Sequence, residues 1–357
     1  MRRRAQRGLL ILTLSAGFAA PVAEAQRAQW EALNQRMLDL YQSANYVEGI
    51  SVGQEALKIA EATFDANHVN VATSLNNLAE MYRAQGRYAD ALPLYERALR
   101  ISEATAGAES PMVAATLNNM GEMYRTQGDG GRAEAMYRRA MTIREKNFGP
   151  DHPDLAQSLN NLALLYATQQ KPEDAERLYQ RALNIYRESL GPDHPLVAAT
   201  LSNLAELYRS LERFAEAEPL YLEAIQISKV KLGSDHPAVA MNLNNLALLY
   251  AEQKKRKEAE RSFQEALAIQ ERRFGRESLA VATMLNNLAT FYQDQGRFKD
   301  AEPLLQRLLT IAEKAYGKDN PSLAAPLNDL AELYKKMGRS KEAQTMAARA
   351  SQLAAAR

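Results

Sequence analysis

Cysteine is absent from the 357 residues of this sequence. Disulfide bonds, thiolate metal sites, a cysteine nucleophile and a lipid-modified amino-terminal cysteine are therefore excluded. Glycine (17) and proline (13) are scarce, which suits a chain that is mostly helical. Neither sign of charge dominates, because 44 Lys and Arg stand against 43 Asp and Glu. Without a strongly basic surface, we expect no nucleic-acid partner.

The amino terminus has an apolar run that is short for a membrane span. This run, Gly8 to Ala20, has 13 residues, whereas a spanning helix usually needs ~18 or more. Four arginines precede it, and the small-residue sequence Ala23-Glu24-Ala25 follows it. This order predicts a secretory signal peptide over residues 1–25 that is cleaved before Gln26; a retained membrane anchor is the alternative. We therefore expect an exported chain, periplasmic or secreted, with no stable membrane span after cleavage.

Motifs of catalysis and cofactor binding are also missing. The sequence has no phosphate-binding GxxxxGK[ST], no HExxH, no GxSxG and no GxGxxG. Its many acidic residues alternate with Lys and Arg, which is typical of solvated helix faces. We therefore expect no enzyme, no cofactor and no metal.

What the sequence does contain is an internal repeat of 42 residues. A pair of asparagines, or a close variant, recurs at this spacing without insertion: Asn76-Asn77, Asn118-Asn119, Asn160-Asn161, Ser202-Asn203, Asn244-Asn245, Asn286-Asn287 and Asn328-Asp329. The repeat predicts seven units: 68–109, 110–151, 152–193, 194–235, 236–277, 278–319 and 320–357. A degenerate unit over residues 26–67 precedes them, with Leu33-Asn34 in the place of Leu75-Asn76.

Each unit has the pattern of a helical hairpin. In unit 152–193 two apolar stripes follow helical spacing: Leu155, Leu159, Leu162, Ala163 and Tyr166, then Ala175, Leu178, Tyr179, Ala182, Leu183 and Tyr186. Pro172 suits the first turn of the second helix. A glycine column that includes Gly149 and Gly191 ends the second helices. In unit 110–151, however, Asp129-Gly130-Gly131 predicts a late start of the second helix.

This pattern resembles the tetratricopeptide repeat. The residues that carry the resemblance in unit 152–193 are Leu159, Leu162, Ala163, Tyr166, Ala175, Tyr179 and Ala182. The 42-residue period and the phrases LNNLA and LGPDHP are similar to the kinesin light chain subtype. The resemblance implies an all-α, right-handed superhelical solenoid of about eight antiparallel hairpins, and general use as a protein-binding scaffold.

Four histidines occupy one column of the repeat, namely His68, His152, His194 and His236. A metal site would need several ring nitrogens within ~2 Å of one ion. Equivalent residues of stacked hairpins are separated by helices whose axes lie ~8–10 Å apart. The same column holds Ser110, Ser278 and Asn320, which are residues that cap helices. We therefore predict helix capping.

The resemblance implies that the first helix of each hairpin lines a concave groove, and two columns of this helix face a partner there. The first column is polar and contains Asn76, Asn118, Asn160, Ser202, Asn244, Asn286 and Asn328. Its amides suit the backbone of an extended peptide. Hydrogen bonding between units is the alternative for this column, and we predict that structural role for the neighbouring column, Asn77 and its equivalents.

The second column alternates between charged and apolar residues. The charged rows are Glu80–Arg83, Glu122–Arg125, Glu206–Arg209 and Glu332–Lys335, whereas Leu164–Ala167 and Leu248–Ala251 interrupt them. We predict two apolar pockets at Leu164 and Leu248; packing of both leucines against a neighbouring helix is the alternative.

These features predict a scaffold that binds a protein or peptide in the groove. Self-association into a larger assembly and regulation of a separate enzyme are the alternatives.

Overall fold

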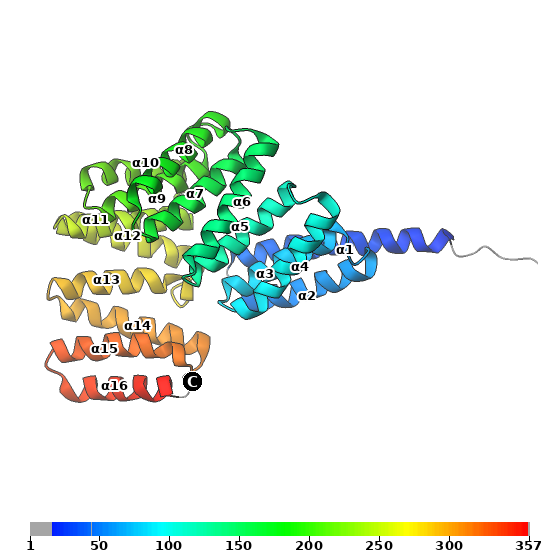
Figure 1. Cartoon of the computed structure of the whole chain (residues 1–357). Coiled ribbons are helices and arrows are strands. Elements are labelled where there is room, and N and C mark those ends of the chain that lie inside the picture. Colours follow the sequence, from blue (N-terminus) through cyan, green and yellow to red (C-terminus); the bar gives the residue numbers. More distant parts are fainter. Residues whose placement is uncertain (1–15, 44, 356–357) are drawn as a thin grey trace, which may run out of the picture. The chain divides into compact units, whose positions relative to one another are not determined.

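The protein is a chain of α-helices without strands in the part that the computed structural model describes, residues 16–43 and 45–355 (Figure 1). The chain splits into two compact units, which are called unit 1 (residues 1–169) and unit 2 (residues 170–357). Unit 1 contains α1 (Ala16–Gln42), α2 (Tyr46–Thr63), α3 (Val69–Ala84), α4 (Tyr88–Ala106), α5 (Pro111–Thr126), α6 (Gly130–Phe148) and α7 (Pro153–Thr168).

Unit 2 continues with the same alternation of helices and short turns. It contains α8 (Pro172–Leu190), α9 (Pro195–Ser210), α10 (Phe214–Leu232), α11 (Pro237–Glu252), α12 (Arg256–Phe274), α13 (Ala282–Asp294), α14 (Phe298–Tyr316), α15 (Ala324–Lys336) and α16 (Ser340–Ala355). Single 3₁₀ turns, Leu279–Val281 and Pro321–Leu323, precede α13 and α15. The predicted all-α array of about eight hairpins is confirmed.

The repeat columns form the core as their spacing predicts. Six alanines that recur every 42 residues are each 0 % exposed, namely Ala91, Ala133, Ala175, Ala217, Ala259 and Ala301. Tyr95, Tyr137 and Tyr221 are also 0 % exposed. Small residues in one column let two helix backbones approach, and the aromatic rings of another fill the remaining space. Six glycines that end second helices, Gly191 among them, have φ between 86° and 95°, in the left-handed region that favours glycine.

Histidine acts as a helix cap in this fold, as predicted. Nδ1 of His68, His152, His194 and His236 accepts a hydrogen bond from the backbone N–H two residues later, at 3.1–3.2 Å. Ser278 and Asn320 accept from the backbone N–H two residues later in the same way, and Ser110 accepts from the N–H of Val113, three residues later. The column therefore starts the first helices.

The prediction of a late second helix in unit 110–151 is wrong. α6 begins at Gly130, in the same register as its counterparts, because Asp129 caps it: Oδ1 of this residue accepts from the backbone N–H of Arg132 at 3.0 Å. This cap compensates for two glycines in the first turn.

The degenerate unit 26–67 also forms a hairpin, α1 and α2. Gly49 and Gly53 in α2 permit close approach, because a Cβ atom there would lie 2.7 Å from Sδ of Met81 and 2.9 Å from Cε of Met37, respectively. Residues 1–15 of the predicted signal peptide lie outside the described residues. α1 continues through the predicted cleavage point before Gln26.

Candidate functional site

The first helices of the hairpins form one layer within each unit. In unit 1, α1, α3, α5 and α7 lie side by side in this order, and in unit 2 so do α9, α11 and α13. We call the exposed surface of the odd-numbered helices the first-helix face and treat it separately in each unit. The odd-numbered helices carry every residue that the sequence predicts for partner binding.

Asparagine side chains link successive first helices. Nδ2 of Asn77 donates to Oδ1 of Asn34 at 2.9 Å. The same hydrogen bond joins Asn119 to Asn76 (3.4 Å), Asn161 to Asn118 (2.9 Å) and Asn287 to Asn244 (2.9 Å). The structural bonds predicted for the second asparagine are therefore present at Asn77, Asn119, Asn161 and Asn287, and each uses the side-chain carbonyl of an asparagine on the preceding first helix.

This ladder limits what the first asparagines can offer. Asn118 and Asn244 are only 7 % and 3 % exposed. Asn76, Asn160 and Asn286 are half-buried, and Asn328 is exposed. Contact of this column with a partner stays a prediction.

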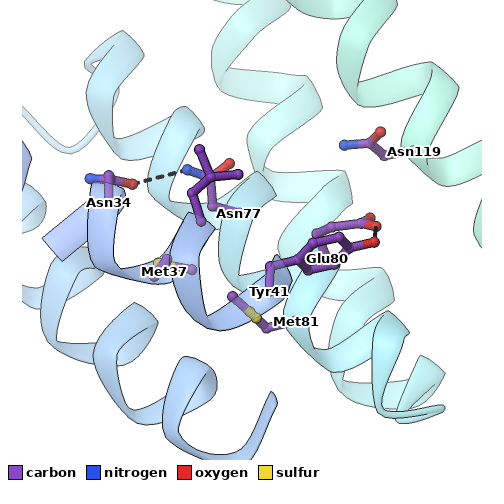
Figure 2. A pocket seen from close by; sticks show the side chains of 8 residues that line it. Asn34, Met37, Tyr41, Asn77, Glu80, Met81 and Asn119 are labelled. Carbon is purple, nitrogen blue, oxygen red and sulfur yellow. Dashed lines mark hydrogen bonds between the residues drawn. The ribbon is translucent and has the colours of Figure 1, made fainter. Parts of the chain in front are cut away.

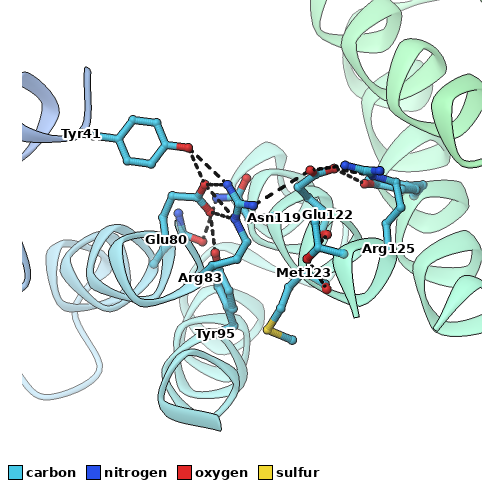
Figure 3. A network of polar contacts seen from close by, with 11 residues as sticks. Tyr41, Glu80, Arg83, Tyr95, Asn119, Glu122, Met123 and Arg125 are labelled. Carbon is cyan, nitrogen blue, oxygen red and sulfur yellow. Dashed lines mark hydrogen bonds and ion pairs between the residues drawn. The ribbon is translucent and has the colours of Figure 1, made fainter. Parts of the chain in front are cut away.

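A ladder of charged side chains crosses unit 1 (Figure 3). Nε of Arg83 donates to Glu80 at 3.0 Å, and Arg125 donates to Glu122 at 2.6 Å. Nη1 of Arg83 also lies 4.0 Å from Oε1 of Glu122, which connects the two rows. The two predicted charged pairs of unit 1 are thus formed and joined along the face. The predicted pair of Glu332 and Lys335 on α15 forms no ion pair within the described residues.

Tyrosines of the second helices donate hydrogen bonds to the glutamates of this ladder. The Tyr95 hydroxyl donates to Oε2 of Glu80 at 2.6 Å, and the Tyr137 hydroxyl donates to Oε2 of Glu122 at 2.9 Å. Burial and the adjacent carboxylate raise the pKa of both phenols. Burial alone would favour the neutral acid at Glu122, but the hydrogen bond and charge of Arg125 lower its pKa. The Glu122 carboxylate is therefore held in the charged form.

Unit 2 has the same arrangement at its amino-terminal end. Arg209 donates to Glu206 at 2.5 Å and contacts Glu252 of the next first helix. The Tyr221 hydroxyl donates to Oε2 of Glu206 at 2.8 Å. Leu164, in unit 1, and Leu248, in unit 2, are half-buried. Their predicted pockets therefore stay a prediction.

A hollow of about 420 Å³ lies between α1 and α3 on the first-helix face of unit 1 (Figure 2). We call it the amino-terminal pocket. It is lined by Asn34, Met37, Leu38, Tyr41, Asn77, Glu80, Met81 and Asn119.

The amino-terminal pocket is lined by both apolar and polar side chains. Met37 and Met81 are each 2 % exposed and present little apolar surface, whereas Leu38 is 49 % exposed. The Tyr41 hydroxyl donates to Oε1 of Glu80 at 3.0 Å and accepts from Nη2 of Arg83 at 3.2 Å. Burial and the charge of Glu80 raise the pKa of Tyr41 to about 12, so this phenol is neutral at ordinary pH. An apolar wall beside fixed polar groups is typical of a ligand pocket.

The sequence contained a signal for this pocket. Leu38 stands 42 residues before Glu80, in the same column as Leu164 and Leu248. Tyr41 stands 42 residues before Arg83, in the equivalent position of the preceding repeat. The predicted binding residues begin at Asn76 because Gly49 and Gly53 mark unit 26–67 as degenerate; only the fold shows that these glycines admit Met37 and Met81.

The repeat of this chain matches a known protein family. The family model described as tetratricopeptide repeat matches residues 31–104, 112–188, 165–229, 197–272 and 280–356. The chain belongs to the tetratricopeptide repeat family. Comparison with curated proteins finds none that matches the chain.

Solved structures of other repeat proteins share the fold. BtubC (BKLC) from P. vanneervenii is 26 % identical, with a TM-score of 0.53 over 64 % of this chain and 91 % of that one. A signal transduction ATPase with a tetratricopeptide repeat sensor from Pyrococcus horikoshii is 14 % identical, with a TM-score of 0.58 over 93 % and 47 %. A Rap protein in complex with competence and sporulation factor is 13 % identical, with a TM-score of 0.56 over 91 % and 98 %.

The described residues form neither a metal site nor a membrane span. Within them, no three His, Cys, Asp or Glu side chains converge as ligands of an ion. No helix in the described ranges is both long and apolar enough to cross a bilayer.

Proposed function

We propose that this tetratricopeptide repeat protein is an interaction scaffold that holds an extended segment of a partner protein on its first-helix face. The amino-terminal pocket is the observation that carries the proposal. Its volume of about 420 Å³ lies in the range of ligand pockets, ~300–1,000 Å³. Two properties, an exposed leucine and side chains that are already fixed by hydrogen bonds, reduce the ordering that binding requires.

The chemistry of the face defines the partner. An apolar side chain of the partner would pack against the exposed Leu38, while the amides of Asn34 and Asn119 would bond its backbone. The Glu80–Arg83 and Glu122–Arg125 rows present both signs of charge, so they favour a segment with alternating charges over a uniformly basic or acidic one. The Rap protein with its bound factor shows that a related fold can hold a ligand.

Selection from a phage-displayed peptide library tests this proposal. We expect the native chain to enrich peptides with a bulky apolar residue, and Leu38→Glu to lose that enrichment at least ten-fold. Leu222→Glu is the matched control, because Leu222 on α10 is 48 % exposed but lies on a second helix. No enrichment by the native chain, or equal loss in both variants, would reject the first-helix face as the binding surface.

The proposal extends to Leu164 and Leu248 as further apolar contacts, each within its own unit. Both are half-buried, so a glutamate at these positions can reach solvent. Replacing both by glutamate should weaken binding of an enriched peptide and leave the helical circular dichroism unchanged. Unchanged affinity would remove these two leucines from the surface.

We also propose that the chain is exported, because residues 1–25 have the order of a secretory signal peptide. The mass of the chain recovered from a bacterial periplasm measures this directly. A chain that begins at Gln26 is the expected result, and a full-length chain in the cytoplasm would overturn it.

A further inference from the structure

A second hollow opens at the carboxy-terminal end of unit 2, between α15 and α16. Its volume is about 670 Å³, and we call it the carboxy-terminal hollow. It is lined by Asn328, Asp329, Ala331, Glu332, Lys335, Ser340, Ala343, Gln344 and Ala347. Glu332 and Ala347 occupy repeat positions that have a defined partnership elsewhere in the chain.

In three other hairpins these two positions hold a glutamate and a tyrosine that bond to each other. The hydroxyls of Tyr95, Tyr137 and Tyr221 donate to the carboxylates of Glu80, Glu122 and Glu206, respectively, at 2.6–2.9 Å. Each tyrosine follows its glutamate by 15 residues, and each ring is 0 % exposed. The space between the two helices of the hairpin is therefore shaped around a phenol.

The two positions also change together where the tyrosine is absent. Phe263 lacks the hydroxyl, and the residue 15 positions before it is Leu248 rather than glutamate. Leu305 is likewise preceded by Thr290. A carboxylate at this position therefore accompanies a phenol. Tyr179 is the exception, because this tyrosine is preceded 15 residues earlier by Leu164 rather than by a glutamate; it interacts with another residue instead.

The last hairpin retains the carboxylate but lacks the phenol. Ala347 takes the place of the tyrosine seven residues into α16, as Tyr95 stands seven residues into α4. Glu332 is exposed and has no hydrogen bond or ion pair among the residues that the structure describes. Lys335 replaces the arginine that pairs with this glutamate in other hairpins. The acceptor and the space remain, and the aromatic side chain does not.

We propose that the carboxy-terminal hollow is a socket for a tyrosine side chain of a partner protein, with Glu332 accepting the hydrogen bond of its hydroxyl. The ring would lie against Ala331, Ala343 and Ala347. A bond from a hydroxyl to a charged acceptor is stronger than one between neutral groups, so the socket distinguishes tyrosine from phenylalanine. That the tyrosine belongs to a partner protein rests on the proposed scaffold function. The ability of the socket to bind a phenol does not depend on that function.

Titration of the full chain with p-cresol, the isolated side chain of tyrosine, tests the socket without a partner. We expect saturable binding in the millimolar range by NMR and at least ten-fold weaker binding of toluene, which has the same ring without the hydroxyl. Ala347→Tyr should weaken p-cresol binding at least ten-fold, because its own ring fills the space. Ala348→Tyr is the matched control, since Ala348 is exposed on the same helix but does not line the hollow.

Two results would overturn the inference. One is equal binding of p-cresol and toluene, and the other is equal p-cresol binding by the native chain and the Ala347→Tyr variant. The melting temperature adds a readout that needs no ligand: Ala347→Tyr should raise it, and a lower value would show that the hollow does not fit the ring. Because p-cresol requires no partner, these results stay separate from the peptide selection at Leu38.

Discussion

The hydroxyl of Tyr95 is expected to stabilise unit 1 through its bond to Glu80, and Tyr95→Phe removes that bond alone. The ring is 0 % exposed and packs unchanged in the variant, whereas the 2.6 Å bond to the carboxylate is lost. A hydrogen bond to a charged group contributes about 1.5–3 kcal/mol. Glu80 keeps its bonds from Tyr41 and Arg83, so we expect the low end of this range, about 1.5 kcal/mol.

Thermal and urea unfolding measure this loss. For a unit of this size, about 1.5 kcal/mol corresponds to a fall of roughly 3–6 °C in melting temperature. Tyr88→Phe is the control on the same helix, because no hydrogen bond of the Tyr88 hydroxyl is seen within the described residues, and it should change stability by less than about 0.5 kcal/mol.

A double-mutant cycle with Glu80→Gln isolates the interaction. Tyr95→Phe should be less destabilising in the Glu80→Gln background than in the native chain, because the charged acceptor is already gone. An equal effect in both backgrounds, or a loss no larger than that of Tyr88→Phe, would refute a stabilising role of the phenol–carboxylate bond. It would also weaken the analogy on which the tyrosine socket rests.

Two further predictions concern the contacts between hairpins. Asn118→Ala leaves Nδ2 of Asn161 without its acceptor and should lower the free energy of unfolding by about 1–2 kcal/mol; Asn286→Ala, at a half-buried position of the same column, should have a smaller effect in the same urea titration. Hydrogen bonds from arginines lower the pKa of Glu176 and Glu260, each of which pairs with the following hairpin. The stabilisation that these two pairs contribute is complete above the unfolded carboxyl pKa of 4.5 and is lost as the pH falls through the lower folded-state pKa. The urea concentration at the unfolding midpoint should therefore decrease when the pH is lowered below 4.5. A midpoint that stays constant from about pH 7 to 3 would contradict this prediction.

The repeating features of the fold could be predicted because local sequence determines them. The 42-residue period, the capping histidines and the glycines that end the second helices depend on helix periodicity and on the conformations of a few residues near each helix end. The start of α6 was predicted wrongly because Gly130 and Gly131 outweighed Asp129, whose capping bond reaches only three residues along the chain.

The sequence by itself therefore determined a helical repeat protein, its hairpin register and the residues of the first-helix face. The tertiary structure decided which of these residues meet. The asparagine ladder joins side chains 43 residues apart, and the bond between Tyr95 and Glu80 crosses from a second helix to a first one. Such contacts depend on how each helix is rotated against its neighbour, which periodicity leaves open. The amino-terminal pocket lies beside Leu38, and the carboxy-terminal hollow lies where Ala347 replaces a tyrosine; in both cases the cavity is formed by the packed neighbouring helices.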